Sequence, residues 1–400
     1  MRVLVADALP SLALDTLSGA GFALRTNASL SGPALEVALQ EFDPEVLVVR
    51  STQVPESALD AAASLGLIVR AGAGTNTIAV AAAAERGIYV ANCPGKNSAA
   101  VAELAFGLMV SADRQIPNAV RDLRDGRWRK KHYSAAEGLA GRTLGLVGLG
   151  AIGLEMVRRA KGFDMPVVAW SRSLTRARAK ELGIRAAASL QDVAAADVVS
   201  VHIALCADTR GMIDADFLAA MRPGATFINT ARGEVVDQAA LLEAVRTKGI
   251  RAGLDVFADE PSGGESTYSG PLCNEELVFA THHIGASTTQ SQEAVAAEAV
   301  RVIQTYRDDG VVPNCVNLCQ RSPATHLLVI RHRDEVGVLA GVLDVLRVAE
   351  LNVQEMENII FDGARAAIAR IRVVGEVCQA TLDLIRGANH VLAVSLVELQ

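Results

Sequence analysis

Short apolar runs alternate with amphipathic stretches through the first hundred residues of this 400-residue chain. The apolar runs predict parallel strands, which are buried on both faces, and the amphipathic stretches predict helices that are buried on one side. Strands are expected at residues 3–6, 46–49, 68–70 and 89–91, and helices at residues 11–20, 33–42, 57–65 and 78–86. This order predicts a small parallel α/β domain.

A longer apolar stretch follows at residues 99–112. Its apolar positions fall on nearly every face of a helix, and not on one stripe alone. A helix of that kind is stable only when it is buried on most sides. We therefore expect this helix to lie between domains or between subunits.

Residues 143–153 join an apolar run to a glycine-rich turn and then to a helical pattern. Gly148, Gly150 and Gly153 fit the G-x-G-x-x-G spacing in the strand–turn–helix context that a dinucleotide site requires. The first glycine allows a tight turn, the second lets the backbone approach a pyrophosphate, and the third lets the helix pack closely on the strand. Unpaired N–H groups at the helix N-terminus would then bind the phosphates. A glycine-rich turn without a ligand is the alternative.

Four more apolar runs alternate with helical patterns and predict a doubly wound Rossmann sheet, with the ligand at the carboxyl ends of its strands. They lie at residues 167–170, 198–204, 226–230 and 252–256. A long helix expected at about residues 288–308 would leave this domain and return to the first one. The N-terminal domain is therefore expected to be discontinuous, with residues 1–97 and 287–317 flanking a dinucleotide-binding domain at residues 98–286.

The pattern changes after a linker at residues 311–323, which contains proline and asparagine. Strand and helix patterns then follow in the order βαββαβ, which is typical of the ferredoxin-like split unit. The strands are expected at residues 327–331, 353–361, 365–374 and 391–397, and the helices at residues 338–349 and 379–386. Residues 325–400 are therefore expected to form a separate small domain.

Charge and composition argue against several classes of function. The formal net charge of -7 and the pI near 5.6 argue against a nucleic-acid-binding surface. No membrane span is expected, because the chain lacks an apolar run of about 18 residues, and its first residues do not have the layout of a signal peptide. The six cysteines lack zinc or disulfide spacing, so we expect free thiols in a cytoplasmic protein without a metal site.

The expected second strand of the Rossmann sheet bears on the choice of cofactor. An Asp or Glu at its end normally binds the ribose 2′-hydroxyl of NAD, but here Ser171 and Arg172 stand at that position. These two side chains could bind the 2′-phosphate of NADP by charge-assisted hydrogen bonds. Alternatively, Arg172 stacks on the adenine and the cofactor is NAD. The sequence favours NADP between these two.

Three polar side chains stand at or just beyond the expected carboxyl ends of later strands. Arg232, Glu260 and His283 together suit the reduction of a 2-keto acid. The arginine can bind a carboxylate bidentately, the histidine can move a proton, and the glutamate can fix the histidine tautomer. Each residue alone also has a purely structural explanation: a surface ion pair, an acid at a helix start, or a core histidine.

Several stretches in this order carry a resemblance to one family. They are residues 49–52, 70–75, 92–98, the glycine turn, 229–233, 254–261 and 283–287. The chain resembles the D-isomer-specific 2-hydroxyacid dehydrogenases over nearly all of residues 1–317, in particular the branch that oxidises 3-phosphoglycerate at the first step towards serine. The resemblance implies a flavodoxin-like substrate domain, a Rossmann domain, and a catalytic trio of Arg232, Glu260 and His283. His282 is then only the neighbour of the catalytic histidine.

The resemblance also implies binding residues on both sides of the cleft between these domains. Substrate contacts are implied at Arg50, Ser51, Gly72, Ala73, Gly74, Asn97, Arg232 and His283. Besides the three glycines of the turn and Ser171 and Arg172, cofactor contacts are implied at Thr75, Ala151, Ile152, Ala231, Arg232, Asp255, His283, Gly285 and Ala286. Members of the family are typically dimers or tetramers. A dimer would place the cluster of Arg129, Lys130 and Lys131 near the active site of a partner subunit.

The C-terminal region resembles an ACT domain, a small regulatory module that binds amino acids between paired copies. His332, Asp334 and Asn352 stand where serine-sensitive relatives have a His, an Asn and a second Asn. Asp334 can accept a hydrogen bond from the ammonium group of serine but cannot donate one. The resemblance therefore leaves two expectations open, an amino-acid effector site or a module for dimerisation only.

Two other functions stay open at this point. The stretch from Trp170 to Ser173 resembles NADP-using hydroxypyruvate and glyoxylate reductases of the same family. A non-catalytic protein that senses nucleotides would also fit the fold and the ACT-like region, although the complete Arg232, Glu260 and His283 set argues against it.

Overall fold

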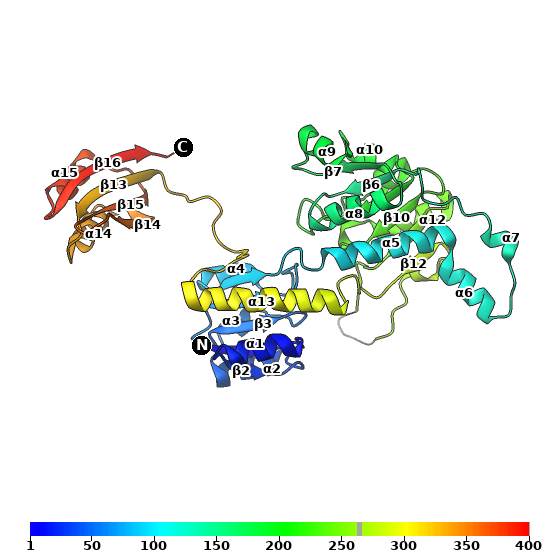
Figure 1. Ribbon diagram of the computed structural model, residues 1–400, viewed down its shortest axis with the longest axis horizontal. Coiled ribbons are helices and arrows are strands. Elements are labelled where there is room, and N and C mark those ends of the chain that lie inside the picture. Colours follow the sequence, from blue (N-terminus) through cyan, green and yellow to red (C-terminus); the bar gives the residue numbers. More distant parts are fainter. Residues whose placement is uncertain (262–265, 400) are drawn as a thin grey trace. The chain divides into compact units, whose positions relative to one another are not determined.

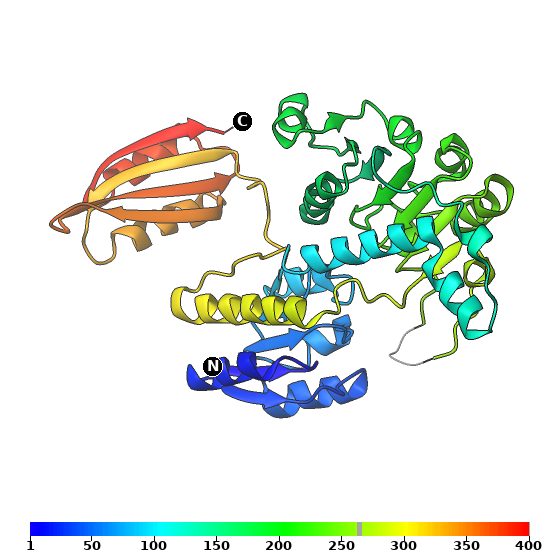
Figure 2. The same cartoon turned by 45° about the vertical axis from the view of Figure 1, so that its right-hand side comes forward.

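The structure is a computed structural model and describes residues 1–261 and 266–399. Its contacts divide the chain into two units, Met1–Asn317 and Leu318–Gln400. Figures 1 and 2 show their elements from two directions. None of the helices in the described residues has both the length and the hydropathy that crossing a bilayer requires.

The first unit begins with a five-stranded parallel sheet in the order β2-β1-β3-β4-β5. This is the strand order of flavodoxin-like folds. The strands are β1 (Arg2–Val5), β2 (Ala23–Thr26), β3 (Val46–Val49), β4 (Leu67–Arg70) and β5 (Tyr89–Asn92). Helices α1 (Ser11–Gly19) and α13 (Thr289–Asp309) pack on one face, and α2 (Pro33–Phe42), α3 (Glu56–Leu59) and α4 (Val80–Glu85) on the other. The long helix expected near the end of this region therefore does pack against the first sheet.

Two predictions for this sheet were incomplete. Strand β2 was not predicted, because it is an edge strand whose side chains are largely exposed and lack an apolar run. The helix expected at residues 57–65 ends after Leu59, since the chain there enters a series of turns. The edge strand β2 is determined by its pairing with β1 and not by a local apolar pattern.

A second parallel sheet has seven strands in the order β12-β11-β10-β9-β6-β7-β8. The order around β6 is that of the Rossmann fold, so two parallel sheets of the predicted kinds are present. The strands are β6 (Leu144–Val147), β7 (Val167–Trp170), β8 (Arg185–Ala186), β9 (Val198–Val201), β10 (Thr226–Asn229), β11 (Arg251–Leu254) and β12 (Val278–Ala280). The short strands β8 and β12 were not predicted.

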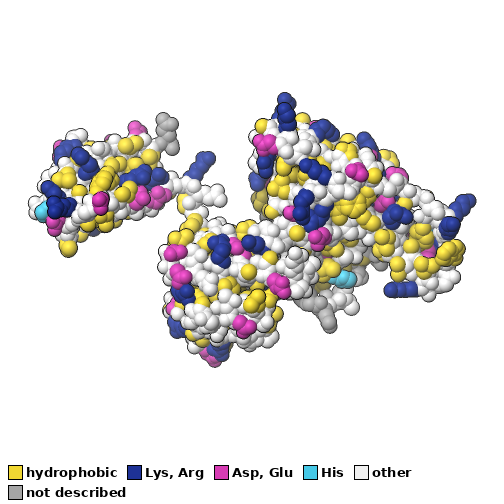
Figure 3. Space-filling model, viewed as in Figure 1, with side chains coloured by type: hydrophobic (Ala, Val, Ile, Leu, Met, Phe, Trp, Pro, Cys, Tyr) yellow, Lys and Arg dark blue, Asp and Glu magenta, His cyan; other side chains and the backbone are white. Residues whose placement is uncertain are grey.

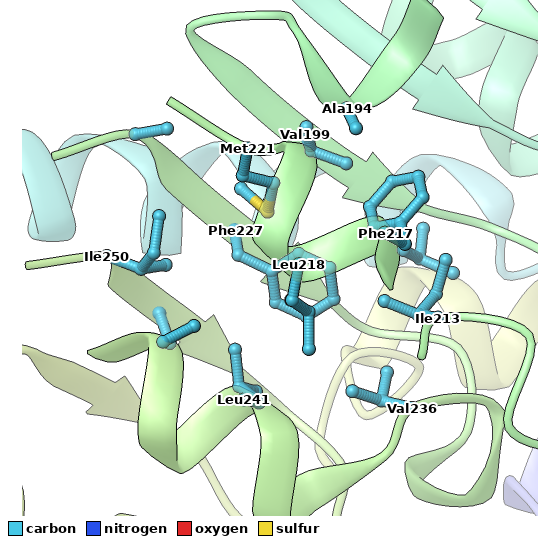
Figure 4. Packing of buried hydrophobic residues seen from close by; sticks show 14 of the residues in the cluster. Ala194, Val199, Ile213, Phe217, Leu218, Met221, Phe227, Val236, Leu241 and Ile250 are labelled. Carbon is cyan, nitrogen blue, oxygen red and sulfur yellow. The ribbon is translucent and has the colours of Figure 1, made fainter. Parts of the chain in front are cut away.

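Helices cover both faces of the second sheet. Helices α5 (Ser98–Arg114) and α8 (Ala151–Gly162) cover one face, and α10 (Leu190–Ala194), α11 (Ala215–Ala220) and α12 (Gln238–Lys248) the other, with α9 (Arg176–Leu182) after β7. Figure 4 shows Phe217 and Phe227 within the hydrophobic cluster that packs α10, α11 and α12 on this sheet, where both side chains are fully buried. Asp214 and Asp237 cap α11 and α12, as expected for aspartates before a helix.

The apolar helix predicted at residues 99–112 is α5, and much of its apolar surface is buried within the unit. It packs against β10, β11 and α8. Beyond it lie α6 (Ile116–Arg124) and α7 (Lys130–Tyr133), and exposed apolar side chains stand beside Lys and Arg in this region, as Figure 3 shows. These apolar side chains are Ile116, Val120 and Leu123 on α6 and Trp128 between the two helices.

The second unit is a four-stranded antiparallel sheet in the order β14-β15-β13-β16. Its elements are β13 (His326–Arg333), α14 (Val338–Val348), β14 (Asn352–Ile360), β15 (Ala366–Val374), α15 (Gln379–Gly387) and β16 (Val391–Glu398). The order βαββαβ agrees with the expectation from the sequence. Both helices share one hydrophobic core with β13 and β15.

Candidate active site

The glycine turn has the shape that a dinucleotide site requires. Gly148 has φ +99°, and a Cβ there would lie 2.4 Å from the carbonyl oxygen of His202. A Cβ on Gly153 would lie 2.4 Å from the carbonyl oxygen of Gly148, so the third glycine permits the close approach of helix and turn. At Gly150, by contrast, the same position is open within 4 Å. Space at the second glycine and uncapped N–H groups at the start of α8 fit a pyrophosphate.

Ser171 and Arg172 follow β7 and are the residues that bear on the choice between NAD and NADP. Ser171 is half-buried and Arg172 is exposed. Within the described residues, neither side chain makes a hydrogen bond or ion pair in the structure. Both can therefore meet a ligand phosphate without first breaking an internal contact.

Arg232 is positioned by a turn that Asn229 organises. The buried Asn229 side chain accepts a hydrogen bond from the Ala231 amide at 3.0 Å and donates one to the Arg232 carbonyl at 2.9 Å. The next residue, Gly233, begins the short 3₁₀ helix η1 (Gly233–Val235) and lies against the chain at Phe257. A Cβ on Gly233 would come within 2.0 Å of the Phe257 carbonyl carbon, so a glycine is needed to bring the Arg232 turn beside the segment that leads to Glu260.

Glu260 and His283 form a hydrogen-bonded pair. The distance between His283 Nδ1 and Glu260 Oε2 is 2.7 Å, and Glu260 Oε1 accepts a hydrogen bond from the Phe257 amide at 2.8 Å. Burial alone would raise the pKa of Glu260, but the hydrogen bonds from His283 and Phe257 and the charges of His283 and Arg232 outweigh it and lower this pKa. The carboxylate therefore stays ionised opposite the imidazole.

Asp255 fixes the backbone that presents His283. Its buried carboxylate accepts hydrogen bonds from the Thr281 hydroxyl at 2.6 Å, the Ile284 amide at 2.9 Å and the Gly285 amide at 2.8 Å. The His283 amide donates to the Asp255 carbonyl at 2.8 Å, and His283 itself has φ +53°. These bonds hold an uncommon backbone conformation in place.

A cavity of about 1580 Å³ collects most of the expected substrate and catalytic residues. The predicted residues in its wall are Arg50, Ser51, Gly72, Asn97, Arg232, Asp255, Glu260, His283 and Ala286, and His282 also lines it. The expected residues outside its wall are Ala73, Gly74, Thr75, Gly148, Gly150, Ala151, Ile152, Gly153, Ser171, Arg172, Ala231 and Gly285. The cavity therefore brings together most of the expected substrate and catalytic residues, and the glycine turn lies outside it.

Several residues of the cavity wall were not predicted as site residues, among them Asp7 and Arg70. Asp7 follows β1 and accepts hydrogen bonds from the amides of Arg50, Ser51 and Thr52, which shapes the turn after β3. Arg70 is the last residue of β4, and its guanidinium lies against Gly72. The available signal was position, since both residues stand at the carboxyl ends of strands in a parallel sheet.

Three guanidinium groups share this cavity. Burial and the neighbouring charges of Arg232 and Arg50 lower the pKa of Arg70 to about 10. Nε of Arg70 is buried without a hydrogen-bond partner in the described part of the chain. Arg70 therefore remains charged at neutral pH. The three guanidinium groups suit a substrate with two anionic groups, and the carboxylates of Asp7, Glu234, Asp255 and Glu260 line the same cavity.

The three expected effector residues do not come together within one chain. His332 is buried, and its ring nitrogens lie 2.7 Å from the Arg333 carbonyl oxygen and 3.1 Å from Asn358 Oδ1. Asp334 lines a second cavity of about 430 Å³, together with Arg333, Glu335, Ala364, Arg365 and His390. Asn352 pairs with Val374 at one end of β15, whereas Arg333 pairs with Ala366 at the other end. An effector site that uses all three would require a second copy.

The fold and this geometry define a dinucleotide-binding α/β protein with a paired acid and base in a cavity that three arginines line. A sequence profile for the NAD-binding domain of D-isomer-specific 2-hydroxyacid dehydrogenases matches residues 106–285. Relatives of this kind extend over most of the chain, and the protein belongs to the D-isomer-specific 2-hydroxyacid dehydrogenase family.

Two curated relatives illustrate the similarity. A D-3-phosphoglycerate dehydrogenase from Archaeoglobus fulgidus is 35% identical over 81% of this chain and 60% of the relative. A hydroxypyruvate reductase from Thermotoga maritima is 40% identical over 65% of this chain and 83% of the relative. The chain spans 58% to 70% of the curated D-3-phosphoglycerate dehydrogenases that it matches.

Solved structures support the same fold for the first unit. An NADPH-dependent glyoxylate/hydroxypyruvate reductase from Sinorhizobium meliloti, solved with NADP and malonate, has a TM-score of 0.66 and 29% identity. The match covers 79% of this chain and 95% of that one.

Proposed function

We propose that the protein is a D-3-phosphoglycerate dehydrogenase, which interconverts 3-phosphoglycerate and 3-phosphohydroxypyruvate with a nicotinamide cofactor at the first step towards serine. The observation that carries this proposal is the group of Arg50, Arg70 and Arg232 in one cavity with the His283–Glu260 pair. A carboxylate and a phosphate on one small substrate would use the three guanidinium groups, whereas glyoxylate has only the carboxylate.

The residues divide the chemistry between them. Arg232 binds the substrate carboxylate and polarises the C2 carbonyl, and Arg50 and Arg70 bind the phosphate. His283 donates a proton to the C2 oxygen during reduction and accepts it during oxidation, while Glu260 holds the ring and stabilises its protonated form. When it is bound, the cofactor supplies or accepts the hydride at C2.

The cofactor would lie along the carboxyl ends of the second sheet. Gly148, Gly150 and Gly153 would hold the pyrophosphate, and Ser171 and Arg172 would lie at the adenosine ribose. The family match supports NAD or NADP, and the free Ser171 and Arg172 side chains favour NADP. The other expected contacts, at Thr75, Ala151, Ile152, Ala231, Asp255, Gly285 and Ala286, remain part of this proposal.

We infer that the enzyme is a homo-oligomer. The buried Asp122 holds Arg127, Arg129 and Tyr133 by hydrogen bonds at 2.6–3.0 Å, so the basic loop is ordered although most of its side chains face outward. Trp128, 80% exposed, stands within this loop. An ordered loop with an exposed tryptophan is suited to contact a second subunit. The second unit is proposed as an ACT-like regulatory or dimerisation module.

The second candidate is a hydroxypyruvate or glyoxylate reductase, which the Thermotoga and Sinorhizobium relatives favour. Steady-state assays of purified protein with phosphohydroxypyruvate, hydroxypyruvate and glyoxylate, each with NADH and NADPH, separate the two. The phosphoglycerate assignment requires a clearly higher kcat/KM for phosphohydroxypyruvate. Equal or better turnover of glyoxylate would support the reductase, and no turnover with any of them would support a non-catalytic nucleotide sensor.

A further inference from the structure

The loop at residues 72–74 lies against Arg70 and Arg232, and residues that do not line the cavity hold it in place. This loop follows β4, and its glycines lie against guanidinium groups: a Cβ on Gly74 would be 2.5 Å from Arg232 Nη2, and one on Gly72 would overlap the guanidinium of Arg70. Within the described residues, the hydrogen bond of the Arg232 guanidinium is to the Ala231 carbonyl, at 2.6 Å. This loop therefore packs directly against the Arg232 guanidinium, whose backbone is held by the Asn229 turn.

Two hydrogen bonds from the end of β5 fix the loop. Asn92 Nδ2 donates to the Ala73 carbonyl at 2.6 Å, and the Cys93 amide donates to the Gly72 carbonyl at 2.9 Å. The Asn92 bond is the one that depends on a side chain. Within the described residues, the Asn92 amide is the donor to the Ala73 carbonyl, so the residue type at position 92 matters.

The end of β5 is itself supported by the segment that leaves the first unit. Residues 314–317 pair with β5 through a bridge between Ala91 and Cys315, a bond from the Asn92 amide to the Asn314 carbonyl at 3.3 Å, and a bond from the Val316 amide to the Val90 carbonyl at 2.8 Å. The Asn314 side chain donates to Glu298 Oε1 at 2.7 Å.

Glu298 links this exit segment to the turn that carries Asn97. Its carboxylate, 7% exposed on α13, also lies 3.3 Å from Lys96 Nζ and 2.6 Å from Arg301 Nη2. Lys96 belongs to the turn between β5 and α5. The buried carboxylate of Glu298 on α13 therefore joins residues 314–317 to the turn between β5 and α5. Both lie next to β5, which ends at Asn92.

We propose that Asn92 is a positioning residue for substrate binding, which holds the Gly72–Gly74 loop against Arg232 and Arg70, and that Asn314 and Glu298 support it through β5. The inference deepens the proposed function and rests on it. Asn92 does not touch the substrate, so its loss should weaken binding of the anionic substrate without removing the proton transfer.

The test is Asn92→Ala, with Asn118→Ala as a matched control. Asn118 also donates from Nδ2 to a backbone carbonyl, that of Glu276, at 3.1 Å, and it is buried away from the loop. For Asn92→Ala we expect the KM for the keto acid to rise about three- to tenfold, the range of one net hydrogen bond, with kcat within about twofold and the NAD(P)H dissociation constant unchanged. Asn118→Ala should lower the thermal stability about as much as Asn92→Ala does, but it should leave KM unchanged.

Asn92→Asp and Asn314→Ala keep the inference testable if the alanine variant does not fold. The aspartate cannot donate to Ala73 and should raise KM at least as much, whereas Asn314→Ala should raise it less, since it acts through the strand. An unchanged KM in a folded Asn92 variant, or an equal rise in KM and in the cofactor dissociation constant, would overturn the positioning role. Absence of turnover in the wild-type protein would instead count against the proposed function.

Discussion

Replacing Glu260 by glutamine tests the acid–base pair with the least change in shape. The carboxylate accepts two hydrogen bonds, from His283 Nδ1 at 2.7 Å and from the Phe257 amide at 2.8 Å. A glutamine has one oxygen, so it can accept only one of them. If it keeps the Phe257 bond, its NH₂ group faces His283 Nδ1 and favours the tautomer in which Nδ1 carries no proton.

The size of the effect follows from the kind of bond that is lost. A hydrogen bond with a charged partner contributes about 1.5–3 kcal/mol, and here it stabilises the charged imidazole that forms during the reaction. Each 1.36 kcal/mol is a factor of about ten in rate. We therefore expect Glu260→Gln to lower kcat/KM about 10- to 150-fold.

The assay is steady-state reduction of phosphohydroxypyruvate followed by NAD(P)H absorbance, with cofactor affinity measured separately by fluorescence. Asp259→Asn is a suitable control, because this neighbouring carboxylate accepts a bond from the Tyr268 hydroxyl at 2.7 Å and does not contact His283. The control should stay within about threefold of wild type. A folded Glu260→Gln enzyme with wild-type kcat/KM would refute the role assigned to the pair.

Three further predictions follow from single side chains. Arg70→Lys should raise the KM for phosphohydroxypyruvate about tenfold or more and change that for glyoxylate little, because one phosphate ligand loses its planar fork; equal effects on both substrates would contradict this. Gly233→Ala should lower the melting temperature by several degrees, since the new methyl group meets the Phe257 backbone and overpacking costs about 1–3 kcal/mol. The hydrogen bond from Arg301, with those from Asn314 and Lys96, lowers the pKa of Glu298 to about 2. In urea titrations the stability difference between wild type and Glu298→Gln should therefore be constant from neutral pH down to about pH 4.5 and shrink as the pH falls towards about 2. A difference that does not change over this range would refute the assignment.

The sequence predicted most of the fold because its strongest patterns are local. Most residues of the buried parallel strands are apolar. The glycine spacing also indicates the geometry of the turn, since Gly148 and Gly153 each lie where a Cβ would overlap a carbonyl oxygen. Strands β2, β8 and β12 escaped prediction, because short or exposed edge strands are defined by their neighbours. The finer domain boundaries within residues 1–317 stay a prediction.

The site was predicted in part for the same reason. Arg232, Glu260 and His283 stand out because each is a reactive side chain at a strand end, and two of them prove to be hydrogen-bonded to each other. Asp7, Arg70 and Asn92 also stand next to or at strand ends. Their roles depend on which loops meet in space, however, and a single sequence does not state that.

Transfer of deuterium from the cofactor to the substrate tests the central claim most directly. The purified protein would be incubated with phosphohydroxypyruvate and NADH or NADPH carrying deuterium at both C4 positions, and the product would be examined by NMR and by chiral analysis. The account predicts D-3-phosphoglycerate with deuterium at C2. It also predicts that a His283→Asn variant, which still binds the cofactor, loses this transfer. Product without deuterium at C2, or undiminished transfer in that variant, would contradict it.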